Sequence, residues 1–155
     1  MITQKSLKKI QKISSSPLET FDIARELAST INSSTLIGIQ GEMGVGKTIF
    51  AKGLGEGLQV KELITSPTFL GISESYSGRL PYVHMDFYKK VTTREIVESH
   101  LKNNAVVLIE WIENFELVFR EKLNLNISVY IQYLKNKNID NLENERQIII
   151  EWYTN

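Results

Sequence analysis

Apolar side chains recur along the chain in two different periods, and together these periods predict a mixed α/β protein. Between residues 18 and 31 they return at every third or fourth position, which is the spacing of a helix with one buried face. Ser16, Pro17 and Glu19 stand before this pattern as an N-cap, a first-turn proline and the third residue of a capping box. The sequence therefore predicts a capped amphipathic helix near the N-terminus.

Shorter apolar patterns predict the strands. Residues 105–109 are continuously apolar, as expected of a strand buried on both faces, and residues 35–40 form another apolar run of strand length. Residues 123–133 alternate between apolar and polar positions, which predicts a strand with one buried face. The other expected elements are a helix over 47–58, strands over 70–76, 81–85 and 146–153, and a short helix from a Thr92–Glu95 cap to Leu101.

Length and composition fit one domain over residues 1–155. The chain has no cysteine, which excludes disulfides, thiol catalysis and cysteine-based zinc sites and fits a reducing compartment. It shows no signal peptide and no apolar stretch approaching about 18 residues, so we expect a cytoplasmic protein without membrane contact. The 18 basic and 18 acidic residues cancel, so a strongly basic nucleic-acid-binding face is not expected.

A glycine-rich segment between the expected strand 35–40 and the expected helix 47–58 carries the most specific chemistry. It reads Gly41-Glu42-Met43-Gly44-Val45-Gly46-Lys47-Thr48 and matches G-x-x-x-x-G-K-[ST] at every fixed position. Its glycines let backbone N–H groups approach a phosphate, and the following helix N-terminus adds positive charge. Lys47 can bridge the β- and γ-phosphates, and the Thr48 hydroxyl can bind Mg²⁺. The expected fold is a P-loop NTPase sheet, parallel near the nucleotide site with antiparallel C-terminal edge strands and helices on both faces.

A P-loop also needs an acidic residue that holds Mg²⁺ or the attacking water. Glu110 ends the apolar run 106–109, and ligands bind at the carboxyl ends of strands in such sheets, so Glu110 is expected to face the site. Asp86 ends the run 82–85 in the same way, but a site residue and a solvated turn aspartate fit that pattern equally well. His84 is interpreted as a packed or surface residue, because a chain with two histidines does not favour a histidine metal site.

A candidate switch segment, Ser66-Pro67-Thr68, lies between the expected P-loop helix and the next strand. P-loop proteins carry a switch there, and the hydroxyls of Ser66 and Thr68 could sense a γ-phosphate. From these residues alone, a simple proline turn before a strand is the stronger interpretation.

The class of nucleotide and of reaction follows by elimination. The guanine-binding pattern N-K-x-D has no proper match, and no D-x-x-G segment follows the P-loop, so ATP is favoured. Three hypotheses remain: an ATPase whose hydrolysis regulates another process, a small-molecule or nucleotide kinase, and a nucleotide-gated binding module with negligible hydrolysis.

Four motifs in this order resemble the TsaE family, also called YjeE, the small ATPases of bacterial tRNA threonylcarbamoyladenosine biosynthesis. The likeness runs from Leu18 to about Trp111, and Lys89 and Leu70 stand where the family usually has arginine and threonine. The matching segments are Gly41–Thr48 for G-[DE]-[LM]-G-[AV]-G-K-T, Ser66–Phe69 for S-P-T-[FY], His84–Tyr88 for H-x-D-x-Y, and Ile109–Trp111 for [IV]-E-W.

The resemblance implies roles for particular residues and for partners. It makes Lys47, Asp86 and Glu110 the catalytic residues, places Mg²⁺ at Thr48, Asp86 and Glu110, and makes Ser66–Thr68 a switch. It also implies a TsaD–TsaB heterodimer as partner, in which TsaD transfers the threonylcarbamoyl group to adenosine 37 of ANN-decoding tRNAs. ATP hydrolysis would reset that complex, and any contact with tRNA would be indirect.

Overall fold

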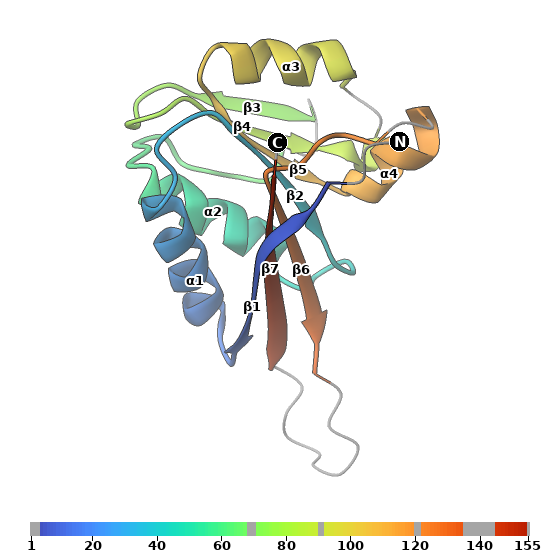
Figure 1. Cartoon of the computed structure of the whole chain (residues 1–155). Helices are drawn as coiled ribbons and strands as arrows, with labels where there is room; N and C mark the ends of the chain where they lie inside the picture. The colour runs from blue at the N-terminus through green and yellow to red at the C-terminus, as the bar shows by residue number, and fades with distance from the viewer. Residues whose placement is uncertain (1–3, 68–70, 90–91, 120–121, 135–144, 155) are drawn as a thin grey trace.

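The computed structural model describes residues 4–67, 71–89, 92–119, 122–134 and 145–154. In these residues seven strands form one sheet with the order β1-β7-β6-β2-β5-β4-β3 (Figure 1). The elements in chain order are β1 (Ser6–Ser14), α1 (Pro17–Ser29), β2 (Thr35–Gln40), α2 (Lys47–Gly57), β3 (Ile72–Ser75), β4 (Tyr82–Asp86), the 3₁₀ turn η1 (Phe87–Lys89), α3 (Arg94–Lys102), β5 (Val106–Glu110), α4 (Ile112–Phe119), β6 (Ile127–Tyr133) and β7 (Arg146–Tyr153). The expected α/β architecture is confirmed.

The centre of the sheet is parallel and its outer strands are antiparallel. β2 pairs in parallel with both β5 and β6, and β4 pairs in parallel with β5. β7 runs antiparallel to β6, β1 antiparallel to β7, and β3 antiparallel to β4. The carboxyl ends of β2, β4 and β5 therefore meet at one edge of the sheet, which is where such folds bind ligands.

Helices cover both faces of the sheet, as the sequence predicted. On one face α1 and α2 pack against side chains such as Ile37 of β2 and Leu108 of β5. On the other face α3 and α4 pack against the alternate residues, including Leu36 and Val107. Because side chains of a strand point alternately to its two faces, the interiors of both strands are apolar on both faces. No helix in the described part of the chain is long and apolar enough to cross a membrane.

Two glycines let α1 and α2 approach each other closely. A Cβ atom at Gly53 would lie 2.2 Å from the Phe21 carbonyl oxygen, and one at Gly57 would lie 2.5 Å from the Arg25 carbonyl oxygen. These residues are four apart on α2 and so share the face turned toward α1. Their small size fixes the position of α2, the helix that starts at the phosphate-binding loop.

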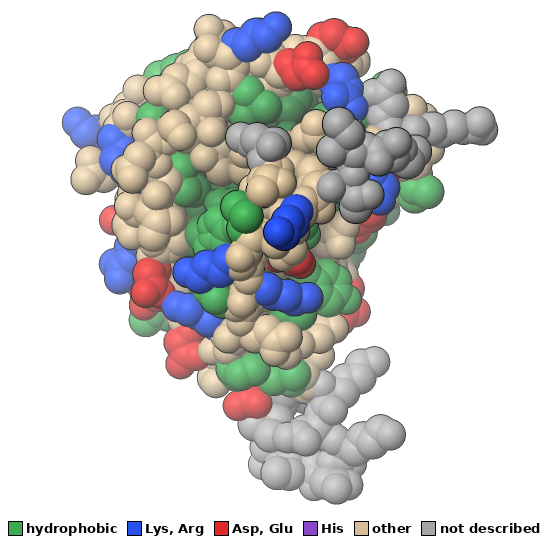
Figure 2. All heavy atoms as spheres, viewed as in Figure 1, with side chains coloured by type: hydrophobic (Ala, Val, Ile, Leu, Met, Phe, Trp, Pro, Cys, Tyr) green, Lys and Arg blue, Asp and Glu red, His purple; other side chains and the backbone are tan. Residues whose placement is uncertain are grey.

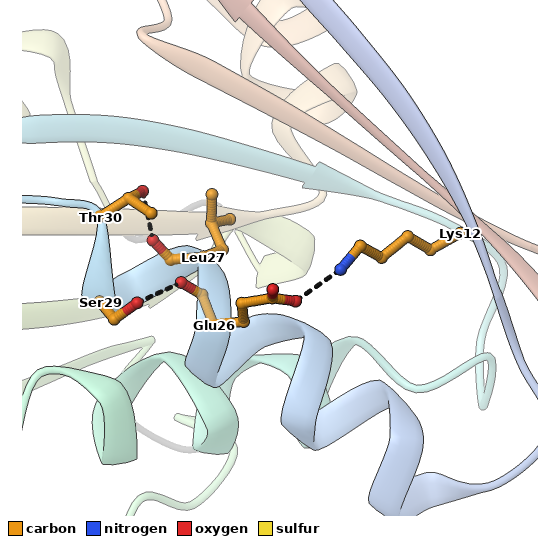
Figure 3. A network of polar contacts seen from close by, with 5 residues as sticks. All are labelled: Lys12, Glu26, Leu27, Ser29 and Thr30. Carbon is orange, nitrogen blue, oxygen red and sulfur yellow. Dashed lines mark hydrogen bonds and ion pairs between the residues drawn. The ribbon is translucent and has the colours of Figure 1, made fainter.

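The ends of α1 are held by local hydrogen bonds. The Ser16 hydroxyl accepts from the Glu19 N–H at 3.1 Å, and the Glu19 carboxylate accepts from the Ser15 N–H at 2.6 Å, so the predicted cap is present. At the other end, the hydroxyls of Ser29 and Thr30 donate to carbonyls of the last turn (Figure 3). The Lys12 ammonium of β1 contacts Glu26 of α1 at 2.5 Å and lowers the pKa of that carboxyl.

Strand β1 is a part of the fold that the sequence analysis did not predict. Figure 2 shows blue basic side chains gathered on the face where β1 crosses the front of the molecule. The lysines of β1 are engaged locally: Lys8 lies 5.0 Å from the Trp152 ring centre, and the ammonium of Lys9 lies 3.8 Å from the Glu151 carboxylate. Lysines on an outer strand disfavour pairing with other chains.

Several boundaries differ from the predictions for physical reasons. The cap of α3 is Thr93, whose hydroxyl accepts from the Ile96 N–H at 3.4 Å, whereas Thr92 is buried. The strand predicted over residues 123–133 starts at Ile127 instead of residue 123, because the Asn126 side chain accepts from the Leu36 N–H at 2.6 Å and so takes the place of a backbone carbonyl in the strand pairing. The strand predicted from residue 70 begins at Ile72, and residues 68–70 lie outside the described residues.

Candidate functional site

The phosphate-binding loop joins the end of β2 to the start of α2. Gly41 lies against the neighbouring strand β6, where a Cβ atom would be 2.5 Å from the Ile131 carbonyl oxygen. Gly46 is the N-cap of α2 and has φ 119°, a conformation that favours glycine. The loop thus needs glycine at both ends, and it directs backbone N–H groups and the positive end of α2 toward one place.

The side chain of Lys47 lies inside this loop. Its ammonium donates to the carbonyl oxygens of Gly41 at 2.6 Å and Glu42 at 3.0 Å, and the residue is 6% exposed. Burial lowers the pKa of Lys47, and this effect exceeds the opposing attraction of Glu110, Glu113, Asp86 and Glu42. A buried ammonium surrounded by carboxylates can exchange its carbonyl contacts for phosphate oxygens when an anion enters.

The two C-terminal strands hold the outside of the loop. The Tyr133 hydroxyl at the end of β6 donates to the Gly44 carbonyl at 2.9 Å. The Arg146 Nε at the start of β7 donates to the Val45 carbonyl at 2.6 Å, and its guanidinium lies 5.1 Å from the Tyr133 ring centre. Sequence analysis missed this support, because the donors are about 90 to 100 positions away from the loop.

The two predicted acidic residues lie side by side. Asp86 ends β4, Glu110 ends β5, and they are register partners in a parallel pair of strands. Neighbouring strands are about 4.8 Å apart, so the two carboxylates face the loop together. Asp86 accepts from the Tyr88 N–H at 2.9 Å, while Glu110 is buried and lies 2.7 Å from the His84 Nε2. His84 is therefore a packed residue, one of the two placements that the sequence suggested, and it also contacts a carboxylate of the site.

The segment before β3 is connected to Asp86 through the backbone. The Gly71 N–H donates to the Pro67 carbonyl at 2.7 Å, and the Gly71 carbonyl accepts from the Asp86 N–H at 2.9 Å. Ser66 lines the same cleft as the loop. Thr68, the remaining residue of the predicted switch, lies outside the described residues.

A cleft of about 530 Å³ brings most of the predicted site residues together. Ligand pockets commonly enclose about 300–1,000 Å³, so this volume suits a nucleotide-sized molecule. The lining consists of Met43, Gly44, Gly46, Lys47, Thr48, Ile49, Ser66, Asp86, Tyr88, Glu110 and Trp111. Of the predicted residues, Gly41, Glu42, Val45 and Pro67 contribute to the framework and do not line it. A larger hollow of about 730 Å³ between β1 and α1 contains none of these residues.

The oxygen donors of the cleft suit Mg²⁺ bound together with a nucleotide. No group of three or more histidine, cysteine or acidic side chains that could hold a metal ion occurs among the described residues. Mg²⁺ in nucleotide sites usually takes one or two carboxylates and completes its six positions with phosphate oxygens and water. Thr48, Asp86 and Glu110 line one cleft and match that donor set.

Two aromatic residues of the cleft were not assigned a role from the sequence. Trp111 follows Glu110 with φ 59°, and its ring centre lies 4.4 Å from the Lys47 ammonium. The Tyr88 ring centre lies 5.3 Å from that of Trp111. The positive φ turns the chain sharply between β5 and α4, and this turn places the indole over the loop. The sequence signal that could have identified Trp111 is its position directly after Glu110, a carboxylate at the end of a strand.

Comparison with known proteins agrees with this architecture. The sequence profile of the family "Threonylcarbamoyl adenosine biosynthesis protein TsaE" matches residues 14–148. The TsaE protein of Bacillus subtilis is 35% identical over 102 residues, which is 64% of this chain and 65% of that protein. The TsaE protein of Streptomyces coelicolor is 33% identical over 113 residues, covering 68% of this chain and 76% of that one. The match thus spans slightly under two thirds of the Bacillus relative.

A solved structure shares the fold. The crystal structure of Bacillus subtilis YdiB superposes with a TM-score of 0.78 and 24% identity, covering 98% of this chain and 90% of that chain. The resemblance noted from the four sequence motifs is confirmed by the profile match, and this chain belongs to the TsaE family of threonylcarbamoyl adenosine biosynthesis proteins.

Proposed function

We propose that this protein is a Mg²⁺-dependent ATPase that serves the formation of N6-threonylcarbamoyladenosine at position 37 of ANN-decoding tRNAs. The observation that carries the proposal is the meeting of Lys47, Asp86 and Glu110 in one cleft of about 530 Å³ at the carboxyl ends of the parallel strands. Membership of the TsaE family supplies the biological context. Lys47, Asp86 and Glu110 are the proposed catalytic residues.

Binding of ATP involves the whole loop. The backbone of residues 41–48 surrounds the β-phosphate, and Lys47 leaves the carbonyls of Gly41 and Glu42 to contact the β- and γ-phosphates. This exchange suits a buried ammonium, because phosphate oxygens are stronger acceptors than neutral carbonyls. Met43 and Val45 contribute their backbone groups, and their side chains take no part in phosphate binding or hydrolysis.

The carboxylates act on the γ-phosphate side of the bound nucleotide. Thr48, Asp86 and Glu110 would hold Mg²⁺, and the bound ion would supply positive charge that offsets the negative charge of the phosphates. Asp86 and Glu110 also orient the attacking water. Hydrolysis needs no second substrate, and this distinguishes the proposal from a kinase.

A switch would couple the state of the nucleotide to partner binding. Two backbone hydrogen bonds, from the Gly71 N–H to the Pro67 carbonyl and from the Asp86 N–H to the Gly71 carbonyl, connect Pro67 to the proposed metal site. We propose that the ATP state orders this segment for docking on a TsaD–TsaB heterodimer, and that hydrolysis releases the protein and resets the complex. The balanced charge of the chain favours an indirect contact with tRNA. The lack of cysteine fits a reducing, cytoplasmic setting.

Phosphate release in the absence of any acceptor tests the proposal. Purified protein with Mg-ATP, alone and with TsaD and TsaB, should release inorganic phosphate, and the Lys47→Ala variant should not. Appearance of the phosphate on a small molecule or nucleotide would identify a kinase instead. Tight ATP binding without turnover, unchanged by the partners, would identify a nucleotide-gated binding module.

A further inference from the structure

His84 is a buried polar residue that the proposed mechanism does not use. It is 1% exposed, and its Nε2 lies 2.7 Å from the Glu110 Oε1, also in a buried side chain. A carboxylate accepts hydrogen bonds and cannot donate them, so Nε2 carries the proton of this contact. The other ring nitrogen, Nδ1, has no hydrogen-bond partner among the described residues, and in this tautomer it presents a lone pair instead of an N–H.

The imidazole ring is itself held in place. Its ring centre lies 6.4 Å from that of Tyr82 with an interplanar angle of 12°, so the two rings are nearly parallel. The Tyr82 hydroxyl donates to the Ala51 carbonyl of α2 at 2.9 Å. Burial and the nearby Glu110 carboxylate raise the pKa of Tyr82, so this hydroxyl keeps its proton. His84 is thus tied through Tyr82 to the helix that begins at the phosphate-binding loop.

The strand register explains why this residue and Glu110 meet. Tyr82, His84 and Asp86 alternate along β4 and therefore share one face of the sheet. Asp86 is the register partner of Glu110, and His84 pairs with Leu108, two positions earlier on β5. His84 consequently lies one step below the two carboxylates, on the side of the core. Glu110 also lines the cleft. Its Oε1 is thus held by His84 on the core side, while the side chain forms part of the cleft lining.

We propose that His84 is a positioning residue, which fixes the rotamer of Glu110 through the Nε2–H···Oε1 hydrogen bond and so aims its carboxylate at the reacting phosphate and metal. This inference rests on the proposed ATPase function and adds a residue to it. A glutamate has three rotatable side-chain bonds, and catalytic geometry tolerates small errors poorly. Residues that orient a metal-binding side chain commonly change activity by about 10- to 100-fold when they are removed.

Two substitutions that differ in reach test the proposal. In His84→Gln the amide nitrogen can occupy the place of Nε2 and donate to Glu110. In His84→Asn the amide nitrogen corresponds to Nδ1 and falls short. We expect His84→Gln to keep most of the turnover and His84→Asn to lower kcat by about 10- to 100-fold, with unchanged affinity for ATP in the absence of Mg²⁺. Equal kcat for folded Gln and Asn variants would overturn the positioning role.

A measurement without turnover tests the contact itself and separates this inference from the ATPase proposal. The chain has two histidines, His84 and His100, so a spectrum of the full protein with ¹⁵N-labelled histidine is simple to assign. We expect one histidine to show an Nε2–H tautomer whose proton resonance disappears in His84→Gln and shifts in Glu110→Gln. An Nδ1–H tautomer for His84, or no response to Glu110→Gln, would overturn the inference even if His84→Asn fails to fold.

Magnesium supplies a third readout. ATP affinity measured with and without Mg²⁺ should show a smaller Mg²⁺-dependent gain in His84→Asn than in His84→Gln. Absence of phosphate release by the wild-type protein would reject the ATPase proposal, whereas an unchanged Mg²⁺-dependent gain in His84→Asn would reject the role of His84.

Discussion

At the scale of single residues, the site is defined by one buried cation among several carboxylates. Lys47 contacts two loop carbonyls and lies under the Trp111 ring, and Asp86 and Glu110 end the neighbouring strands. Its environment favours an incoming anion, because burial removes water from the ammonium while its present partners are weak acceptors. Two substitutions test this description, one for the charge of Lys47 and one for the charge of Glu110.

Replacing Lys47 by methionine should change how stability depends on pH. Since burial lowers the pKa of Lys47, the unfolded chain binds more protons than the folded protein between the lowered value and about 10.4. Wild-type stability should therefore rise with pH across that interval relative to Lys47→Met. We expect the free energy of unfolding of Lys47→Met minus that of the wild type, measured in urea, to be larger near pH 7 than at about pH 9.5. If this difference stayed constant or increased toward the higher pH, it would contradict the environment described for Lys47.

Replacing Glu110 by glutamine should separate binding from turnover. The amide oxygen of glutamine can still accept from the His84 Nε2–H, so the local packing is retained while the negative charge is lost. We expect ATP to bind and kcat to fall by about 10²- to 10³-fold, the usual effect of removing one catalytic electrostatic contact. Glu95→Gln on α3, which does not line the cleft, is the matched control and should leave kcat unchanged. Normal phosphate release by Glu110→Gln would remove this residue from the mechanism.

At the scale of elements, the position of α2 depends on its close contact with α1. Gly53→Ala would bring a Cβ atom to 2.2 Å from a backbone carbonyl oxygen, which cannot move aside without shifting α1. We expect a net loss of about 1–3 kcal/mol in the free energy of unfolding, although alanine favours helix formation. Gly55→Ala is the control, because its nearest neighbours at 2.7 Å and beyond are side-chain atoms of Ile64 and Tyr82. Urea denaturation would contradict this view if Gly53→Ala were as stable as the wild type.

Elements with strong local patterns were predictable from sequence. The helix capped by Ser16 and the strands β2 and β7 were predicted with the observed first residues, because caps and apolar runs are local signals. Strand β1 was missed, because Leu7 and Ile13 are exposed and Ile10 alone of its apolar residues packs on the core. Helix α4 was missed too. It starts directly after the turn at Trp111 and has two buried residues, Ile112 and Phe115.

The site divides in the same way. The loop at Gly41–Thr48 and the position of Glu110 were predictable, since each depends on neighbours in sequence, whereas the local pattern at Asp86 fitted a solvated turn equally well. The contacts of His84, Tyr133 and Arg146 join positions 26 to 101 residues apart and follow from strand register. Register is set by the whole sheet, so a single sequence read segment by segment does not reveal these contacts.

At the scale of the whole molecule, the nucleotide state should control association with partners. The path from Pro67 through Gly71 to Asp86 connects the cleft to the segment before β3. We expect a pull-down with TsaD and TsaB to retain more of this protein with Mg-ATP than with Mg-ADP, and Lys47→Ala to lose the difference. Equal retention in both nucleotide states would contradict the proposed coupling, while ATP hydrolysis itself could still be correct.

Calorimetry tests most directly whether the cleft at Lys47 binds ATP. Titration of Mg-ATP into the wild-type protein should give saturable heat with one site per chain. Lys47→Met, which keeps the length of the side chain and removes the charge, should weaken that binding by about 10- to 100-fold, as expected for a charge-assisted hydrogen bond. Absence of heat for adenine nucleotides with Mg²⁺ present, with or without TsaD and TsaB, would contradict the account as a whole.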